Sequence, residues 1–174
     1  MKFLVDCMLG KLAKWLKILG FDVAYFNKAK DSDLLAIARR EKRILLTGDH
    51  RLLEGAKDIQ SLLLQSEKWP EQVEQVLKEL SLQQKTKPFS RCLQCNVELK
   101  KLPKKKAKNL VAPFIFEHAA SLAICPSCGR VFWPGTHFED MEFKLEEILG
   151  KKKKAGTRKR SDQLSKAQKN RMRK

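Results

Sequence analysis

Long apolar runs are missing from this sequence, and their absence excludes one class of protein. No stretch of about eighteen apolar residues occurs in the 174-residue chain, so no segment is expected to cross a membrane. The first residues, MKFLVDCML, carry an acid at position 6 and no small-residue cleavage site, so no secretory signal is expected. A disulfide framework is not expected either, because four of the five cysteines form two C-x-x-C pairs, which suit a reducing compartment and a bound metal. These features predict a cytoplasmic protein.

Acidic residues are scarce at the carboxyl-terminal end, where the basic charge gathers. Residues 151–174 contain twelve lysines and arginines and one acid, Asp162, which gives +11 of the formal net charge of +17. This segment has few apolar side chains to bury, so we predict that it is disordered when free. Such a block most often meets a polyanion, and nucleic acid is the commonest one in a cytosol. The alternative is a tail that only solubilises or localises the protein.

The first half of the chain alternates between two kinds of apolar pattern. Short apolar runs that suit strands are separated by segments with apolar residues at helical spacing, which predicts β-α-β units and a parallel sheet. The expected strands are 2–6, 21–26, 43–47 and 59–65, and the expected helices are 7–20, 31–42 and 69–82. The predicted fold class is therefore α/β, with about four parallel strands.

From residue 88 the composition changes to cysteine, proline, lysine and aromatic residues with short strand-like pieces between them. A closing helix is expected at 139–149 and can pack back on the first domain. We therefore predict an α/β domain at 1–87, a second module with the closing helix at 88–150, and a basic tail at 151–174.

Carboxylates follow the predicted strands. Asp6 ends the first strand, Asp49 follows the third, and Asp31 opens the helix after the second. Because parallel strands all point the same way, these acids meet at the carboxyl edge of the sheet, with Asp33 two residues beyond Asp31. If the strand order is 2-1-3-4, Asp6 and Asp49 lie on neighbouring strands ~4.8 Å apart.

Acids gathered in this way predict a site for a divalent cation, because close carboxylates repel unless a cation lies between them. Oxygen ligands favour Mg²⁺ or Mn²⁺, and such an ion can activate a water and neutralise a phosphate, as in two-metal nucleases. Simpler roles are open to two of the acids: Asp31 could be only a helix cap, and Asp33 a solvated first-turn acid. We predict Asp6, Asp31 and Asp49 as metal ligands and catalytic residues, with Asp33 as a further candidate.

The two cysteine pairs, Cys92-x-x-Cys95 and Cys125-x-x-Cys128, have the spacing of zinc knuckles. Four thiolates with no open position make a structural, tetrahedral Zn²⁺ site. A redox pair is the alternative, but neither motif opens a helix after a strand. Because 29 residues separate the pairs, the lysine-rich segment 100–109 is expected to form a protruding loop.

Basic and aromatic side chains outside these sites suit phosphate contacts and base stacking, and so single-stranded RNA. The candidates for RNA contact are Lys11, Lys14, Lys17, Lys104, Lys105, Lys106 and Trp133. Trp133 could equally pack against the zinc knuckle. His118 is expected to be structural.

The order of these motifs resembles the Mut-seven C-terminal RNase domain family. The resemblance covers about residues 2–145 and rests on D-x-MLGKLAKWLKILGFDV, DSDLLAIA, RILLTGD, the cysteine pairs and VFWPGTHFEDM. It implies a PIN-like, Rossmann-like nuclease fold fused to a zinc ribbon. It also implies catalytic acids at Asp6, at Asp31 in a D-x-x-h-h-x-x-A helix, and at Asp49 in a T-x-D strand end. The nearest counterpart of the further acid usual in PIN-like nucleases is Asp33.

Two functions from different classes fit these features. The leading hypothesis is a metal-dependent ribonuclease, with the zinc ribbon and basic tail assisting RNA binding. The alternative is a non-catalytic RNA- or ribosome-associated binding protein on a degenerate PIN-like fold. The incomplete acid set and the basic tail favour the alternative, whereas Asp6, Asp31 and Asp49 in matching contexts favour the enzyme.

Overall fold

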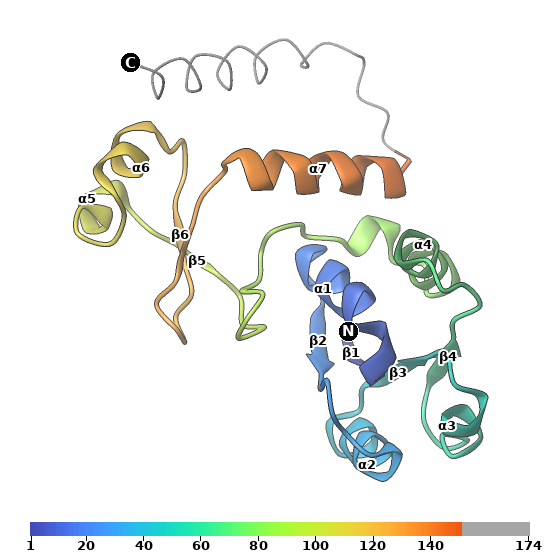
Figure 1. Cartoon of the computed structure of the whole chain (residues 1–174). Coiled ribbons are helices and arrows are strands. Elements are labelled where there is room, and N and C mark those ends of the chain that lie inside the picture. Colours follow the sequence, from blue (N-terminus) through green and yellow to red (C-terminus); the bar gives the residue numbers. More distant parts are fainter. Residues whose placement is uncertain (151–174) are drawn as a thin grey trace, which may run out of the picture.

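Four strands form an all-parallel sheet in the order β2-β1-β3-β4, which confirms the predicted α/β class and strand order (Figure 1). The computed structural model describes residues 1–150, so the basic segment 151–174, for which disorder is predicted, lies outside the described residues. The strands are β1 (Lys2–Val5), β2 (Asp22–Tyr25), β3 (Ile44–Thr47) and β4 (Ser61–Leu63). Each lies within the range expected from the sequence.

Helices cover both faces of this sheet. They are η1 (Cys7–Leu9), α1 (Gly10–Ile18), α2 (Asp31–Glu41), the short α3 (His50–Glu54), α4 (Trp69–Glu79) and η2 (Gln83–Lys85). Figure 1 shows α1 and α4 on one side of the sheet and α2 and α3 on the other. Successive side chains of a strand point to opposite faces, so Phe3 and Val5 pack into the core under α1 and α4, whereas Leu4 packs under α2 and α3. No helix within residues 1–150 is long and apolar enough to span a bilayer.

The end of α1 joins the first domain to the segment that follows it. Gly20 ends the helix with a φ of +93°, and a Cβ there would lie 2.2 Å from the carbonyl oxygen of Lys87. The backbone N–H groups of Lys87 and Phe89 donate to carbonyls in the last turn of α1, at 2.9 and 2.7 Å. Glycine is therefore required at position 20 both for its conformation and for the close approach of the chain.

The second module contains a three-stranded antiparallel sheet and two short helices. Its elements are β5 (Lys100–Lys101), α5 (Lys104–Ala107), α6 (Pro113–His118), β6 (Ala123–Ile124) and β7 (Val131–Phe132). The lysine-rich segment is therefore not the simple loop that its composition suggests. Leu102, Ala107 and Leu122 are buried together, and this small core holds both helices.

The closing helix α7 (Thr136–Ile148) packs back on the first domain. Leu145 is 3% exposed and belongs to the core that covers one face of the parallel sheet, and α7 contacts α4. Phe138 of α7 also packs against Phe89, with ring centroids 4.1 Å apart. The main core therefore continues past residue 87 and includes side chains from the second module.

Candidate functional site

Asp6 is a buried carboxylate at the carboxyl end of a central strand. It directly follows β1 and its side chain is 5% exposed. Its backbone N–H donates to the carbonyl of Leu46 at 3.0 Å, so the sheet hydrogen bonding to β3 continues through it. The hydroxyl of Thr47 donates to Oδ2 of Asp6 at 2.8 Å. A buried acid held in this way has a fixed position at the edge of the sheet.

Thr47 connects Asp6 to Asp49. Its side chain is fully buried, and the same hydroxyl that donates to Asp6 accepts a hydrogen bond from the backbone N–H of Asp49 at 2.9 Å. One oxygen therefore joins the loop after β1 to the loop after β3. The threonine of the T-x-D pattern thus has a positioning role that sequence reasoning missed, since the contact depends on the register between two strands.

Asp49 also begins α3. Its Oδ1 accepts from the backbone N–H of Arg51 at 2.7 Å, which makes Asp49 the N-cap of this helix, and its side chain is exposed. Asparagine caps helices about as well as aspartate. A change to asparagine should therefore keep the local structure and remove only the charge.

Asp31 and Asp33 lie in the first turn of α2, and both are exposed. The N-cap residue is Lys30 and no side-chain cap bond is present there, so the alternative capping role of Asp31 is not observed. Within residues 1–150, Asp6, Asp31 and Asp49 do not form a cluster as close as that of the four cysteines. A shared Mg²⁺ or Mn²⁺ ion therefore stays a prediction.

A pocket of about 420 Å³ opens between the segment that follows Asp6 in the chain and the start of α4, and none of the four predicted acids lines it. Its lining residues are Cys7, Met8, Leu9, Gly10, Lys11, Tyr25, Glu67, Trp69 and Gln72. Glu67 brings a further acid to this edge, and sequence reasoning missed it because it lies in the loop after β4 and in no recognised motif. Of the three lysines predicted on α1, Lys11 lines this pocket.

The surroundings of Cys7 and Lys17 shift the pKa values of both side chains. A hydrogen bond with Asp6, burial and the charge of Asp6 together raise the pKa of the Cys7 thiol, which makes it a poor nucleophile. Burial lowers the pKa of Lys17, and this outweighs the negative charges of Cys92 and Asp22, which raise it. Lys17 lies six residues along α1 from Lys11, or ~9 Å, near the cysteines and away from the pocket. Lys14 is exposed between them.

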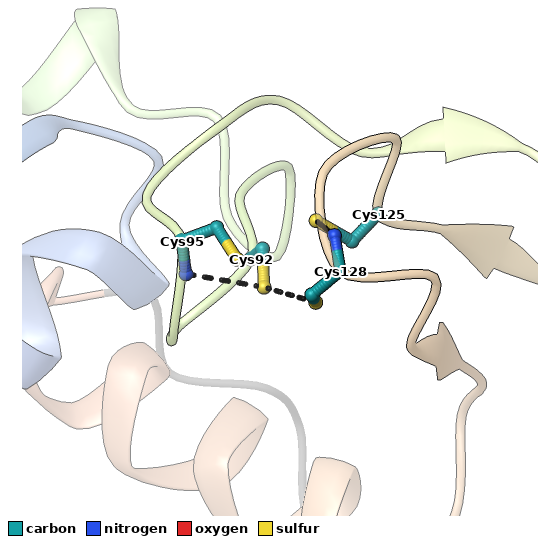
Figure 2. Close-up of side chains that lie close together, drawn as sticks. All are labelled: Cys92, Cys95, Cys125 and Cys128. Atoms are coloured by element: carbon teal, nitrogen blue, oxygen red, sulfur yellow. Dashed lines mark hydrogen bonds between the residues drawn. The ribbon is translucent and has the colours of Figure 1, made fainter.

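The four cysteines form a metal-binding cluster (Figure 2). Their sulfur atoms all lie within 4.8 Å of one another, and those of Cys92 and Cys128 are 3.8 Å apart. A tetrahedral Zn²⁺ with bonds of about 2.3 Å places its sulfurs about 3.8 Å apart, so four thiolates in this arrangement suit zinc. Burial raises the pKa of Cys125, but N–H groups of Cys128 and Ser127 donating to its sulfur outweigh this and lower the pKa to about 7. The thiolate form that a metal requires is thus favoured at Cys125. At Cys128 the backbone N–H of Arg130 lowers the pKa, but burial and side-chain hydrogen bonds with Cys125 and Cys95 outweigh it and raise the pKa.

The two knuckles have the same turn but different residues at its end. The N–H of Asn96 donates to the carbonyl of Cys92 at 2.8 Å, and the N–H of Gly129 donates to that of Cys125 at 3.0 Å. Both residues have positive φ, 61° for Asn96 and 72° for Gly129. Glycine is the usual residue for this conformation, so an asparagine here indicates a role for its side chain.

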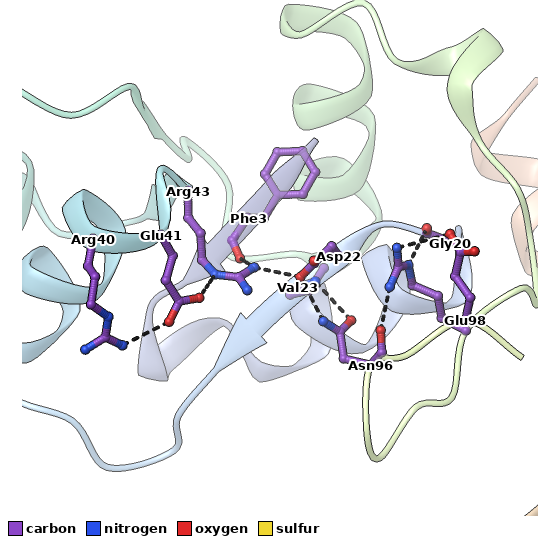
Figure 3. A network of polar contacts seen from close by, with 10 residues as sticks. Phe3, Gly20, Asp22, Val23, Arg40, Glu41, Arg43, Asn96 and Glu98 are labelled. Carbon is purple, nitrogen blue, oxygen red and sulfur yellow. Dashed lines mark hydrogen bonds and ion pairs between the residues drawn. The ribbon is translucent and has the colours of Figure 1, made fainter. Parts of the chain in front are cut away.

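That side chain attaches the first knuckle to the edge strand β2 (Figure 3). Oδ1 of Asn96 accepts from the backbone N–H of Val23 at 3.0 Å, and its Nδ2 donates to Asp22 at 2.9 Å. Asp22 also accepts from Arg43 at 2.7 Å. Burial raises the pKa of Asp22, but these hydrogen bonds outweigh it and hold the pKa below its ordinary value. Arg91 adds a second link, because its Nε donates to the carbonyl of Gly20 at 3.0 Å.

We expect Asn96→Gly to weaken this attachment without changing the knuckle. Glycine keeps the positive φ, while Val23 and Asp22 each lose a hydrogen-bond partner, which should cost about 2 kcal/mol of unfolding free energy. The matched control is Gly129→Asn, where a Cβ would meet nothing within 4 Å. The φ of 72° disfavours any side chain but is tolerated by asparagine, as at position 96, so a loss clearly smaller than that of Asn96→Gly is expected. Urea denaturation of zinc-loaded protein measures both. Equal loss of stability in the two variants would show that the asparagine side chain has no special role.

The basic residues of the second module are at its surface. Lys104 donates from Nζ to the carbonyl of Glu117 at 3.1 Å, and so ties α5 to α6. Lys105 and Lys106 are exposed, and Trp133 is 40% exposed after β7. All of these candidates are accessible to a ligand.

Comparison with known proteins identifies one family. The family model described as the Mut7-C RNAse domain matches residues 1–145. No curated protein and no solved structure matches the chain. The matched region contains the parallel sheet, the loops that carry Asp6 and Asp49, and all four cysteines of the cluster. The chain therefore belongs to the Mut7-C RNase domain family.

Proposed function

We propose that this protein is a metal-dependent ribonuclease of PIN-like fold that acts on single-stranded RNA. Family membership indicates a nuclease-type function on RNA. The observation that carries the finer proposal is the contact between Asp6 and Thr47. A 5% exposed carboxylate at the end of a central strand is costly to bury, and the hydroxyl that positions it also positions the loop of Asp49.

The acids at the carboxyl edge of the parallel sheet are proposed to bind the catalytic metal ion. Asp6 and Asp49 are the proposed ligands of Mg²⁺ or Mn²⁺, with Asp31 as a third and Asp33 as a further candidate. When bound, such an ion would lower the pKa of a water and neutralise charge on the scissile phosphate. Thr47 holds the two loops together. Lys11 and Glu67 face the same pocket, where the lysine can attract the phosphate backbone.

The zinc ribbon and the basic tail are proposed to supply RNA affinity. Zinc in the Cys₄ cluster has no open coordination position, so its role is to hold the module together. The exposed lysines of α5 and residues 151–174 are then available for phosphates. This division places binding and chemistry on different parts of the chain.

Removing residues 151–174 should weaken RNA binding and reduce its dependence on salt. Twelve lysines and arginines are lost, and each phosphate they neutralise on a single strand contributes about 0.7 to the slope of log affinity against log salt. Cleavage of bound RNA under single-turnover conditions should be unchanged. Titrations of labelled RNA at several salt concentrations measure the effect. An unchanged affinity and slope would exclude the tail from RNA binding.

Incubation of zinc-loaded protein with 5′-labelled single-stranded RNA and Mn²⁺ tests the proposed activity. The expected result is shortened products that are absent when Asp6→Asn protein, purified in the same way, replaces the wild type. This control separates the activity from contaminating ribonucleases. If RNA is bound but is not cut in the presence of Mn²⁺ or of Mg²⁺, the chain is instead a binding protein on this fold.

A further inference from the structure

Phe114 presents an unusually exposed aromatic ring on α6. Its residue is 65% exposed, more than any other aromatic residue among the large exposed apolar residues of positions 1–150. One helical turn later, the ring of His118 stacks on it, with centroids 4.4 Å apart and planes inclined by 22°. Nδ1 of His118 lies 2.9 Å from the carbonyl of Phe114 and donates to it, since a carbonyl only accepts. The histidine thus supports one face of the phenylalanine and leaves the other accessible.

The surroundings of this ring are strongly basic. Six exposed lysines lie within residues 100–108, and the single acid between residues 100 and 118 is Glu117. Helix α5 lies beside α6 (Figure 1). Lys104 links the two helices, because its Nζ donates to the carbonyl of Glu117 at 3.1 Å and lies 5.5 Å from the centroid of the Phe116 ring. The small core of Leu102, Ala107 and Leu122 fixes the same two helices. Lysines and the stacked rings therefore belong to one rigid unit.

We propose that α5 and α6 form a single-stranded RNA-binding site in which a base stacks on Phe114 and the lysines contact phosphates. The identity of the ligand rests on the ribonuclease function proposed above. A base placed on the free face of Phe114 would extend the stack that His118 begins. Bases inside a duplex are already stacked on their neighbours, so their faces cannot reach the ring. Lys105, Lys106 and Lys108 supply the charge complementarity that a purely apolar partner would not use.

The site can be tested without any cleavage. Zinc-loaded full-length protein is titrated into single-stranded RNA containing 2-aminopurine, with no Mg²⁺ or Mn²⁺ added, while anisotropy and base fluorescence are followed. Phe114→Ala should bind about tenfold more weakly and lose most of the fluorescence quenching that stacking produces. Phe114→Trp should retain both. Duplex RNA of the same length should compete poorly.

Phe143 supplies a matched control. It is 52% exposed, and its helix α7 carries five acids and one lysine, so Phe143→Ala should bind as the wild type does. Wild-type affinity and quenching in Phe114→Ala would overturn the stacking site, whether or not the protein cleaves RNA. Equal competition by duplex RNA, or no binding of RNA by the wild type, would overturn it too. Intact stacking in a protein that never cuts RNA would reject the ribonuclease and keep this site.

Discussion

Asp6→Asn and Asp49→Asn should each slow metal-dependent RNA cleavage by at least ~10²-fold. Either change removes one ligand charge and keeps the shape of the side chain. Binding of the metal ion would therefore be weakened, or the ion would be misplaced. The hydroxyl of Thr47 can still donate to the amide oxygen at position 6, and asparagine can still cap α3 at position 49. RNA binding should change little or become tighter, because repulsion of the phosphate is reduced. Single-turnover cleavage in Mn²⁺, beside a binding titration, measures both effects.

Asp33→Asn is the comparison for these variants. Asp33 is exposed in the first turn of α2, so its loss should have a mild effect. Asp31→Asn should behave like Asp6→Asn if Asp31 is a ligand, and Glu67→Gln tests the acid that faces the pocket. Wild-type cleavage rates in both Asp6→Asn and Asp49→Asn would refute the metal site at this edge.

Cys92→Ser should release zinc and unfold much of the second module. Cys92 is fully buried, and the turn that it begins presents Asn96 to β2. Loss of the metal should therefore remove the hydrogen bonds to Val23 and Asp22 as well, and Tm should fall by ~10 °C or more. The parallel sheet retains its own helices and should stay folded at lower temperature. Elemental analysis and thermal melts followed by circular dichroism give the two readouts.

Cys7→Ser is the control for the zinc experiment, because Cys7 follows β1 and is not part of the cysteine cluster. It should keep full zinc content. A wild-type protein without zinc, or Cys92→Ser protein at full occupancy, would show that the cluster has another purpose.

The parallel sheet could be predicted because the sequence patterns that specify its strands and helices are local. Apolar runs such as FLV and ILL, separated by amphipathic segments, specify strands and crossover helices, and right-handed crossovers restrict the possible strand orders. The cysteine cluster could be predicted for a similar reason, since C-x-x-C spacing encodes the knuckle itself. Asp6 and Asp49 were placed at one edge by the same topology.

The contacts that hold these parts together could not be predicted. The bond between Thr47 and Asp6 depends on the register of β1 and β3, and Asn96 reaches a strand 73 residues earlier in the chain. Helix α5 lies in the segment 100–109 that the sequence predicts as a loop, because its apolar side chains form a core only when Leu102 and Leu122 meet. Stacking of Phe114 on His118 has only a faint sequence signal, an aromatic pair four residues apart, because the contact depends on the helical conformation of α6.

The most direct test of the metal-dependent ribonuclease is the single-turnover rate of RNA cleavage as a function of Mn²⁺ concentration. Zinc-loaded wild-type and Asp49→Asn proteins are compared on the same single-stranded RNA at saturating protein. We predict a wild-type rate that rises from background and saturates, and an Asp49→Asn curve that is flat or displaced to at least ~10-fold higher Mn²⁺. A wild-type rate that does not respond to Mn²⁺, or two superimposable curves, would contradict the proposal.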